Sequence, residues 1–491
     1  MDYFPNEIIL KIFKYLDRDG LKEMLCVNKR FRELIITNSF LMRRLPLNVS
    51  KNWLSKIEFA NNYGDFVKSL TMDYTIFETI DEFKIFINLF ANIEKLKINY
   101  IYIKQPDYEI IKNSSIESHE IKNTENEEEE RVAFDNLKTI DISSKFFGYI
   151  TNIDTKILNH LNTFKIQSLA IKLPMQKFSS NFIDFLCKQS KLKELSVFDE
   201  FIDSFLFDDF TENITYNQFI SSLFEIDLSK KATFQLKKLA INYRGDHREN
   251  FQKFLSTQNE LEELEIRKYE DDFVRFKITF DLIRDFRVRK LIIPLELMQT
   301  NLIYDIENFI NKNVIELTLK GYNNDPVLFN IMLKIFPNIK RLRLEYMLEF
   351  ACENLSTLQH LEILEADHFK IDCMKNVKIN KLKKLVIGNL YPILYTDWEE
   401  VTKINANIQE IVINEVSHFN TLTCIKNSVT LLLRDLKRLS FLKIIQNESS
   451  DCLRIIADMK TKKLKLSPLA MKMLREILTN HTRFDAINYL F

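Results

Sequence analysis

The chain has 491 residues, with 69 basic and 69 acidic side chains, so its formal net charge is zero. A dedicated nucleic-acid-binding protein carries a basic excess, and we therefore expect no nucleic-acid partner. Apolar residues make up 46% of the chain, which excludes global disorder. No run approaches the roughly 20 apolar residues of a membrane span, so we expect no membrane partner. At this length, several domains or an elongated array are expected.

The first 47 residues read as three short helices. Pro5 suits the first turn of a helix, and apolar residues follow at helical spacing from Ile8 to Leu16. Asp19 is predicted to cap a second helix and Asn28 a third. This unit carries more apolar residues than so small a domain can bury. We therefore expect it to need a partner.

The order and spacing of these residues resemble an F-box. The matching segments are Phe4-Pro5, Glu7-Ile8, Ile12-Phe13 with Leu16, Asp19 with Leu21, and Val27 with Lys29-Arg30-Phe31. The resemblance implies docking onto the Skp-type linker of a cullin ubiquitin ligase. By the same resemblance, the linker-binding residues would be Phe4, Pro5, Ile8, Ile12, Phe13, Leu16, Leu21, Val27, Arg30 and Phe31. The alternative is a helical cap that seals the end of the following domain.

Beyond about residue 60, the pattern apolar-x-x-apolar-x-apolar recurs along the chain. In the second half its copies start at Leu236, Leu261, Val288, Val314, Ile339, Leu358, Leu382, Ile408 and Leu436. The steps of 19 to 28 residues correspond to the period of leucine-rich repeats. The last two apolar residues of each copy alternate as in a strand, and helical patterns precede several strands. One helix and one strand cannot bury their apolar faces alone, whereas stacked copies can.

The predicted fold class is therefore α/β, with an N-terminal three-helix F-box followed by an irregular leucine-rich-repeat solenoid, or horseshoe. The F-box spans residues 1–47 and the repeats span 48–445. An acidic insert near 104–133 is too polar to bury a core and is predicted to be disordered, either as a docking loop or as a tolerated insertion. Residues 446–491 are predicted to form a helical C-terminal cap, with helices at 452–459 and 469–478.

Residues between the buried positions of each predicted strand point to the opposite face of the sheet. This candidate target-binding face consists of Glu263, Glu265, Arg267, Lys290, Glu316, Lys320, Arg341, Arg343, Glu345, His360, Glu362 and Lys384. Neighbouring strands alternate between acidic and basic residues. The charge pattern either recognises a partner or keeps the sheet soluble. The asparagine or cysteine that usually follows the strand of a leucine-rich repeat is mostly missing, so the turn backbone needs other hydrogen-bond partners.

The sequence offers no catalytic motif. The six glycines are too far apart for a P-loop, a dinucleotide-binding loop or a nucleophile elbow. The seven histidines show no HExxH or other paired-ligand spacing. We therefore expect no enzyme, no cofactor and no metal. The six cysteines are scattered without a CxxC pair, which predicts reduced thiols in the cytoplasm or the nucleus.

Together with the resemblance, these features predict the substrate-recognition adaptor of a Skp–cullin–F-box ubiquitin ligase. The helices would dock the linker, and through it the cullin, while the repeats would hold an unknown target protein for ubiquitination. The alternative is a non-catalytic leucine-rich-repeat interaction scaffold whose N-terminal helices only cap the solenoid.

Overall fold

The structure is a computed structural model. It describes residues 4–45, 47–51, 53–77, 80–99, 101–103, 137–143, 165–172, 180–198, 224, 227–242, 248–267, 284, 286–298, 309–321, 326–347, 352–390, 395–416, 425, 428–429, 432, 436, 438–446, 453–458 and 463–472. The acidic insert predicted near 104–133 lies outside these residues. The chain forms two compact units, the first comprising Met1–Asn242 with His247–Glu260 and the second Tyr243–Asp246 with Leu261–Phe491.

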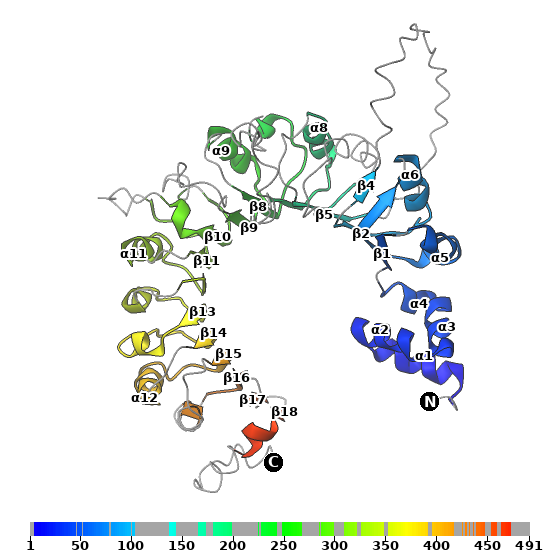
Figure 1. Cartoon of the computed structure of the whole chain (residues 1–491). Helices are drawn as coiled ribbons and strands as arrows, with labels where there is room; N and C mark the ends of the chain where they lie inside the picture. Colours follow the sequence, from blue (N-terminus) through cyan, green and yellow to red (C-terminus); the bar gives the residue numbers. More distant parts are fainter. Residues whose placement is uncertain are drawn as a thin grey trace, which may run out of the picture. The chain divides into compact units, whose positions relative to one another are not determined.

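The first unit begins with four helices rather than three (Figure 1). They are α1 (Asn6–Tyr15), α2 (Arg18–Val27), α3 (Lys29–Thr37) and α4 (Ser39–Met42). Asn28 caps α3 as predicted, since its side chain accepts a hydrogen bond from the Phe31 N–H at 2.8 Å. The predicted cap of α2 was wrong by two residues, because Asp17 rather than Asp19 accepts the Gly20 N–H at 2.8 Å.

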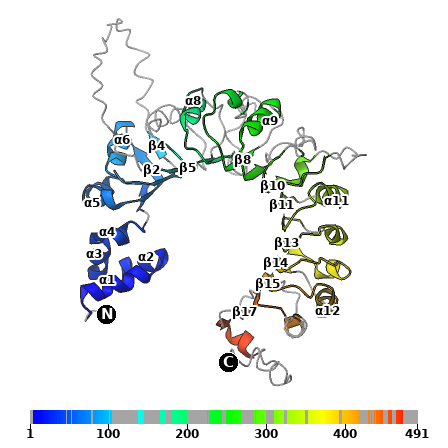
Figure 2. The ribbon, with the colours of Figure 1, turned by 180° about the vertical axis from the view of Figure 1, so that it is seen from behind.

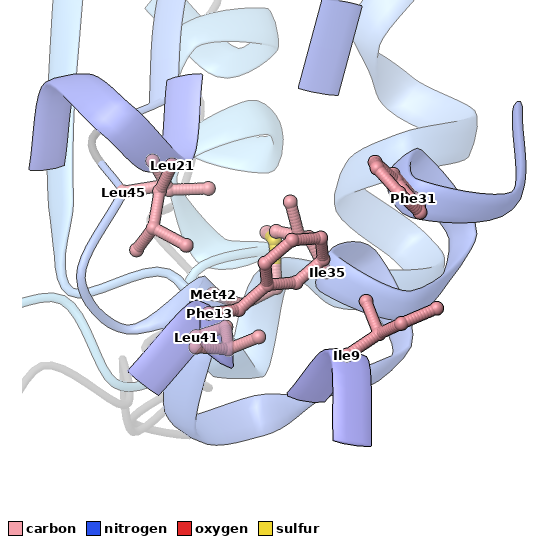
Figure 3. Close-up of a cluster of buried hydrophobic side chains, with 8 residues drawn as sticks. All are labelled: Ile9, Phe13, Leu21, Phe31, Ile35, Leu41, Met42 and Leu45. Atoms are coloured by element: carbon pink, nitrogen blue, oxygen red, sulfur yellow. The ribbon is translucent and has the colours of Figure 1, made fainter. Parts of the chain in front are cut away.

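A single core holds these helices together (Figure 3). Its eight buried residues are Ile9, Phe13, Leu21, Phe31, Ile35, Leu41, Met42 and Leu45. The rings of Phe13 and Phe31 meet edge to face, with centroids 5.3 Å apart. Phe59 and Phe66, which follow in the chain, pack against the same core. The short helix α4 and these two phenylalanines therefore supply apolar surface that three helices alone would lack.

The first unit continues with alternating helices and strands. They are β1 (Leu47–Lys51), η1 (Leu54–Lys56), α5 (Ile57–Tyr63), η2 (Gly64–Phe66), β2 (Ser69–Phe77), α6 (Ile80–Asn88), β3 (Lys95–Ile98), β4 (Ile101–Ile103), β5 (Thr139–Ser143), β6 (Ser168–Lys172), α8 (Ser180–Lys188), β7 (Glu194–Phe198), η6 (Leu228–Lys230), β8 (Lys238–Asn242) and α9 (Arg248–Thr257). Strands β1, β2, β3, β5, β6, β7 and β8 pair in parallel in that order. Strand β4 pairs with the second half of β2.

The second unit has the same construction. Its elements are β9 (Glu263–Arg267), β10 (Lys290–Pro294), η7 (Leu295–Leu297), β11 (Glu316–Lys320), α11 (Pro326–Ile335), β12 (Arg341–Glu345), η9 (Cys352–Thr357), β13 (Ile363–Phe369), η10 (Ile371–Met374), β14 (Lys384–Leu390), α12 (Tyr395–Ile404), β15 (Glu410–Val416), β16 (Phe441–Gln446), β17 (Leu453–Asp458) and β18 (Lys463–Leu466). Strands β9 to β16 pair in parallel in chain order. Helices α11 and α12 lie on one side of these strands in both views (Figures 1 and 2).

The pairing register explains why the strands stack. One row of buried residues crosses the second unit: Leu264, Leu291, Leu317, Leu342, Leu364, Leu385, Ile411 and Leu442. Each repeat places an apolar side chain against the same position of its neighbour. The sheet is therefore buried on its helix side and carries its polar residues on the other side.

Buried amides supply the hydrogen-bond partners that the turns need. The Asn405 side chain accepts from the Ile379 N–H and donates to the Val377 carbonyl, each at 2.9 Å, and so joins two consecutive repeats. Gln258 accepts from the Leu236 N–H at 2.8 Å in the first unit. These amides come three residues before the first buried position of their repeat, rather than after the strand.

For one repeat, the sequence pattern predicted the wrong set of buried strand positions. The pattern Leu358-Leu361-Ile363 was predicted to form its strand, but the strand pairs Leu364 with Leu342 and Ala366 with Leu344. The repeat therefore reads Leu361-Leu364-Ala366. Both frames carry apolar residues at the same spacing, and only the pairing with the neighbouring strand distinguishes them.

The predicted helical cap of residues 446–491 is also wrong in part. Residues 453–458, predicted to be helical, form β17, which pairs antiparallel with β16, and β18 pairs antiparallel with β17. Leu453, Ile455 and Ala457 are buried at every second position, which is the period of a strand. Residues 468–472 are helical, as predicted for the start of the second helix, and the remainder of that prediction lies outside the described part of the chain.

The expectation of reduced thiols fails for one pair of cysteines. Cys352 and Cys373 form a disulfide, with their Cα atoms 5.7 Å apart. They lie in η9 and η10, which occupy equivalent places in consecutive repeats. Stacking of these repeats brings together two cysteines that stand 21 residues apart in sequence. Cys26 is exposed and Cys187 is buried, and both are free thiols.

Candidate functional site: two protein-binding surfaces

Helix α1 carries two apolar faces. Ile9 and Phe13 point into the core, whereas Ile8 and Tyr15 are 42% and 92% exposed. Ile12 is partly exposed and lies between them at helical spacing. A helix that serves only its own core needs one apolar face. The outer face of α1 is therefore an apolar surface that the helices themselves do not use.

Two further apolar residues of the helical domain are exposed. Phe4 and Val27, at the start of α1 and the end of α2, are 47% and 55% exposed. Arg30 on α3 fixes the start of the chain, because its guanidinium donates to the Phe4 carbonyl at 2.7 Å and to the Asn6 side chain at 2.7 and 3.0 Å. We define the helix surface as Phe4, Ile8, Ile12, Tyr15 and Val27.

The structure divides the ten residues predicted to contact a linker into two groups. Phe13, Leu21 and Phe31 are buried in the core, and Leu16 packs against it. Side chains buried in the core cannot contact a linker, so this part of the prediction was wrong. An apolar pattern in the sequence does not distinguish the face of a helix that points into the core from the face that points to solvent. Phe4, Pro5, Ile8 and Val27 are exposed, while Ile12 and Arg30 are partly exposed. Tyr15, which the predicted set does not include, is exposed as well.

In the second unit, charged side chains of the candidate target-binding face form ion pairs with one another or with neighbouring residues. Lys290 contacts Glu263 at 2.9 Å on the neighbouring strand. Lys384 contacts Glu410 at 2.9 Å in the same way. Arg341 contacts Glu365 at 2.8 Å, and its other terminal nitrogen lies 4.0 Å from Glu316. Because acidic and basic residues alternate across the parallel strands, their side chains pair and neutralise one another.

A second group of ion pairs surrounds Lys320. Its ammonium lies 3.2 Å from Glu265 and 3.3 Å from Glu345. Arg267 contacts Glu265 at 2.8 Å, and Arg343 contacts Glu345 at 2.9 Å. Burial alone would raise the pKa of Glu265, but the hydrogen bond and charge of Arg267, together with Lys320, bring that pKa below its usual value. The Glu265 carboxylate therefore stays ionised at neutral pH.

Two predicted members of the face lie elsewhere. His360 and Glu362 precede β13 because of the frame shift, so they do not share the strand face. Glu362 pairs with Lys383 at 2.8 Å, and this hydrogen bond lowers its pKa. His360 Nδ1 lies 3.2 Å from the Lys381 ammonium. The position predicted for them belongs to Ile363 and Glu365, and the correct strand frame would have revealed both.

Apolar side chains also lie on this face. Val386 and Val412 are partly exposed and stand opposite each other on β14 and β15. Ile363 and Phe441, also partly exposed, occupy the flanking strands β13 and β16. The face is therefore a mixture of compensated charges and small apolar patches, and a partner would meet little net charge there.

Metal-ligating side chains do not gather in the described part of the chain. No group of three or more histidine, cysteine, aspartate or glutamate side chains in this part could hold a metal ion. Within the same residues, no helix has the length and apolar character needed to cross a membrane.

Comparison with known proteins agrees with the N-terminal geometry. Residues 1–48 match the model of the F-box-like family, which covers the four-helix domain. This match supports a general role as an F-box adaptor of ligases of the Skp–cullin–F-box type, since F-box domains generally bind Skp-type linkers. A search of curated proteins found no match to the chain.

Proposed function

We propose that this chain is the substrate-recognition adaptor of a Skp–cullin–F-box ubiquitin ligase. Its N-terminal helices would bind the Skp-type linker, and its repeats, as an irregular leucine-rich-repeat solenoid, would bind a target protein. The chain itself would perform no chemistry. Its contribution would be proximity, because holding the target beside the conjugating enzyme raises the effective concentration of the reacting groups.

The observation that carries this proposal is the helix surface. An exposed apolar surface on a small helical domain is costly unless a partner covers it. The surface lies within residues 1–48, the segment that matches the F-box-like family. The core beneath it is complete, so the exposed residues are available for binding rather than for folding.

A second candidate is a scaffold whose N-terminal helices only cap the repeats. Phe59 and Phe66 support it, because they pack against the helical core from the neighbouring elements α5 and η2. That contact does not involve Ile8, Val27 or Tyr15, which remain exposed. Capping explains the inner side of the helical domain and leaves the helix surface without a role.

Co-expression of the full chain with a Skp-type linker separates the two candidates. The adaptor proposal predicts a stable one-to-one complex by size-exclusion chromatography with light scattering. A soluble, monomeric chain that elutes apart from an equally soluble linker would favour the scaffold.

A further inference from the structure

The disulfide between Cys352 and Cys373 closes a covalent ring around one whole strand of the second unit. Cys352 is the first residue of η9 and Cys373 lies in η10, so all of β13 lies between them. The two cysteines stand 21 residues apart in sequence, which is about the length of one repeat. The bond therefore ties together the two ends of the segment that carries β13.

Strand β13 contributes two side chains to the polar side of the sheet. Ile363 and Glu365 are partly exposed there, and Glu365 binds Arg341 of β12 at 2.8 Å. Both cysteines lie outside the strand, in the segments that connect β13 to β12 and to β14. The bond thus constrains this part of the sheet face without occupying it.

The two cysteines differ in their access to solvent. Cys352 is only 2% exposed, whereas Cys373 is partly exposed. A thiolate in solution breaks a disulfide by attacking a sulfur that it can reach. Cys373 is therefore the point of attack, and Cys352 is the cysteine that leaves.

The repeats around the bond have a packed core of their own. Leu355 and Leu358 before β13, and Ile371 and Met374 after it, are each at most 2% exposed. Strand β13 also pairs in parallel with β12 on one side and with β14 on the other. Two thiols can take the place of the bond in such a core, because a free cysteine packs as a small apolar residue. These contacts favour a folded chain both with the bond and without it.

We propose that Cys352 and Cys373 form a redox-responsive modification site that determines how often β13 opens from the sheet. The reductant and the oxidant are the two forms of a small thiol such as glutathione. The closed ring hinders opening because it removes conformations from the locally unfolded segment. If Ile363 and Glu365 belong to a target-binding face, the bond regulates target binding, and that step rests on the proposed function.

Reduction of the bond takes two thiol–disulfide exchanges. The thiolate of one glutathione attacks the Cys373 sulfur, the bond to Cys352 breaks, and Cys352 leaves with the electron pair and takes up a proton from solvent. A second glutathione thiolate attacks the glutathione sulfur of this mixed disulfide, so that Cys373 leaves, takes up a proton, and oxidised glutathione forms. The two glutathione molecules thus supply two electrons and two protons. Oxidation runs in the reverse order, with Cys352 as the resolving thiol.

The compartment decides whether such a pair changes its state. The cytoplasm and the nucleus keep most thiols reduced, and disulfides that form there are usually transient and redox-sensing. The adaptor proposed above would work in these compartments. A bond with one accessible cysteine would then open at the resting glutathione ratio and close when oxidised glutathione accumulates.

The first experiment measures the state of the bond in the full chain. The chain is equilibrated at fixed ratios of reduced to oxidised glutathione, free thiols are alkylated, and the peptides that contain Cys352 and Cys373 are quantified by mass spectrometry. We expect the pair to be more than about 80% reduced at a cytosol-like ratio, and more than about 80% oxidised after a roughly hundredfold fall in that ratio. A bond that stays intact at both ratios, or a pair that stays reduced at both, would overturn the proposal.

Single variants test the order of attack. Cys352→Ala leaves only the accessible cysteine, so oxidised glutathione should form a stable mixed disulfide at Cys373. Cys373→Ala leaves the buried cysteine, and Cys352 should then react at least about tenfold more slowly. The exposed Cys26 and the buried Cys187 are internal references in the same samples, and circular dichroism checks that both variants fold. Equal rates at the two positions would contradict the assigned roles.

Hydrogen exchange measures the effect of the bond on the strand. Amides of β13 should exchange at least about tenfold faster in the reduced chain than in the oxidised chain, whereas those of β10 in the same unit should change by no more than about twofold. Combined Cys352→Ala and Cys373→Ala should match the reduced chain at every glutathione ratio. No change in β13, or an equal change in β10, would overturn the role given to the bond. None of these measurements uses a linker, so a chain that passes them and fails to bind a linker would count against the adaptor function alone.

Discussion

The Arg341 Nη2 atom lies 2.8 Å from the Glu365 Oε1 atom and joins strand β12 to β13 on the side of the sheet away from the helices. Arg341 stands opposite Ile363 in the register, so its guanidinium reaches diagonally to Glu365. The Glu365 side chain is only 13% exposed. Both charges are compensated within the protein, and the pair stabilises the stacking of two repeats.

A double-mutant cycle measures this contact. Arg341→Met and Glu365→Gln, singly and together, should show a coupling of about 0.5–1 kcal/mol in the free energy of urea unfolding, because the pair is partly shielded from water. The more exposed pair Lys403–Glu399 on α12, at 2.9 Å, is the control, with an expected coupling of about 0.3–0.5 kcal/mol. Zero coupling between Arg341 and Glu365 would mean that the pair does not form in solution.

Glu265 should make stability depend on pH in the acid range. Burial raises its folded-state pKa, but Arg267 and Lys320 together bring that pKa below its usual value, so the unfolded chain takes up the proton first as the pH falls. The stabilisation is fully present above the unfolded value and is lost as the pH drops through the folded value. Glu265→Gln should therefore flatten the fall in unfolding free energy below about pH 4.5. Parallel curves for both proteins would contradict this account.

Asn405 should be one of the most sensitive polar positions of the second unit. Asn405→Ala leaves the Ile379 N–H and the Val377 carbonyl without their buried partner. We expect a loss of about 1–3 kcal/mol in unfolding free energy. Asn407→Ala is the matched control: the exposed Asn407 donates to the Asn380 carbonyl at 3.1 Å and accepts from Arg438 at 3.0 Å, both within reach of water, so its loss should cost about 0.5 kcal/mol or less. Similar losses of unfolding free energy at both positions would contradict the conclusion that buried amides stabilise the contact between repeats.

The two faces of α1 should respond differently to truncation. Phe13 is fully buried, and Phe13→Ala should destabilise the helical domain by about 3–5 kcal/mol. Tyr15→Ala, two residues away and almost fully exposed, should change stability by about 0.5 kcal/mol or less. Thermal unfolding followed by circular dichroism compares them. A large effect at Tyr15 would show that the outer face is covered within the chain.

The repeat period and the alternation of apolar and polar residues along each strand could be predicted from the sequence, because each strand must bury one face. The register was not always readable. Leu358, Leu361 and Ile363 fit the repeat as well as Leu361, Leu364 and Ala366 do, and only the row of buried residues across neighbouring strands separates the two frames. The error displaced His360 and Glu362 from the strand face and hid Glu365.

The helical domain shows a similar limit. The apolar spacing of α1 to α3 follows from local chemistry. Asn28 caps α3 as expected, whereas the cap of α2 was misplaced by two residues. Which apolar residues point inward depends on contacts far along the chain, such as those of Leu41 and Phe59. The β17 strand was missed for the same reason, because its conformation is determined by pairing with β16.

The most direct test of the central claim is the affinity of the full chain for a Skp-type linker, measured by isothermal titration calorimetry. The native chain and the control Val327→Asp, which changes an exposed valine of the second unit, should bind equally. Ile8→Asp combined with Val27→Asp should weaken binding at least about a hundredfold while the helical domain stays folded, because it places two charges in an apolar interface. Unchanged binding by this variant, or no binding by the native chain, would contradict the account.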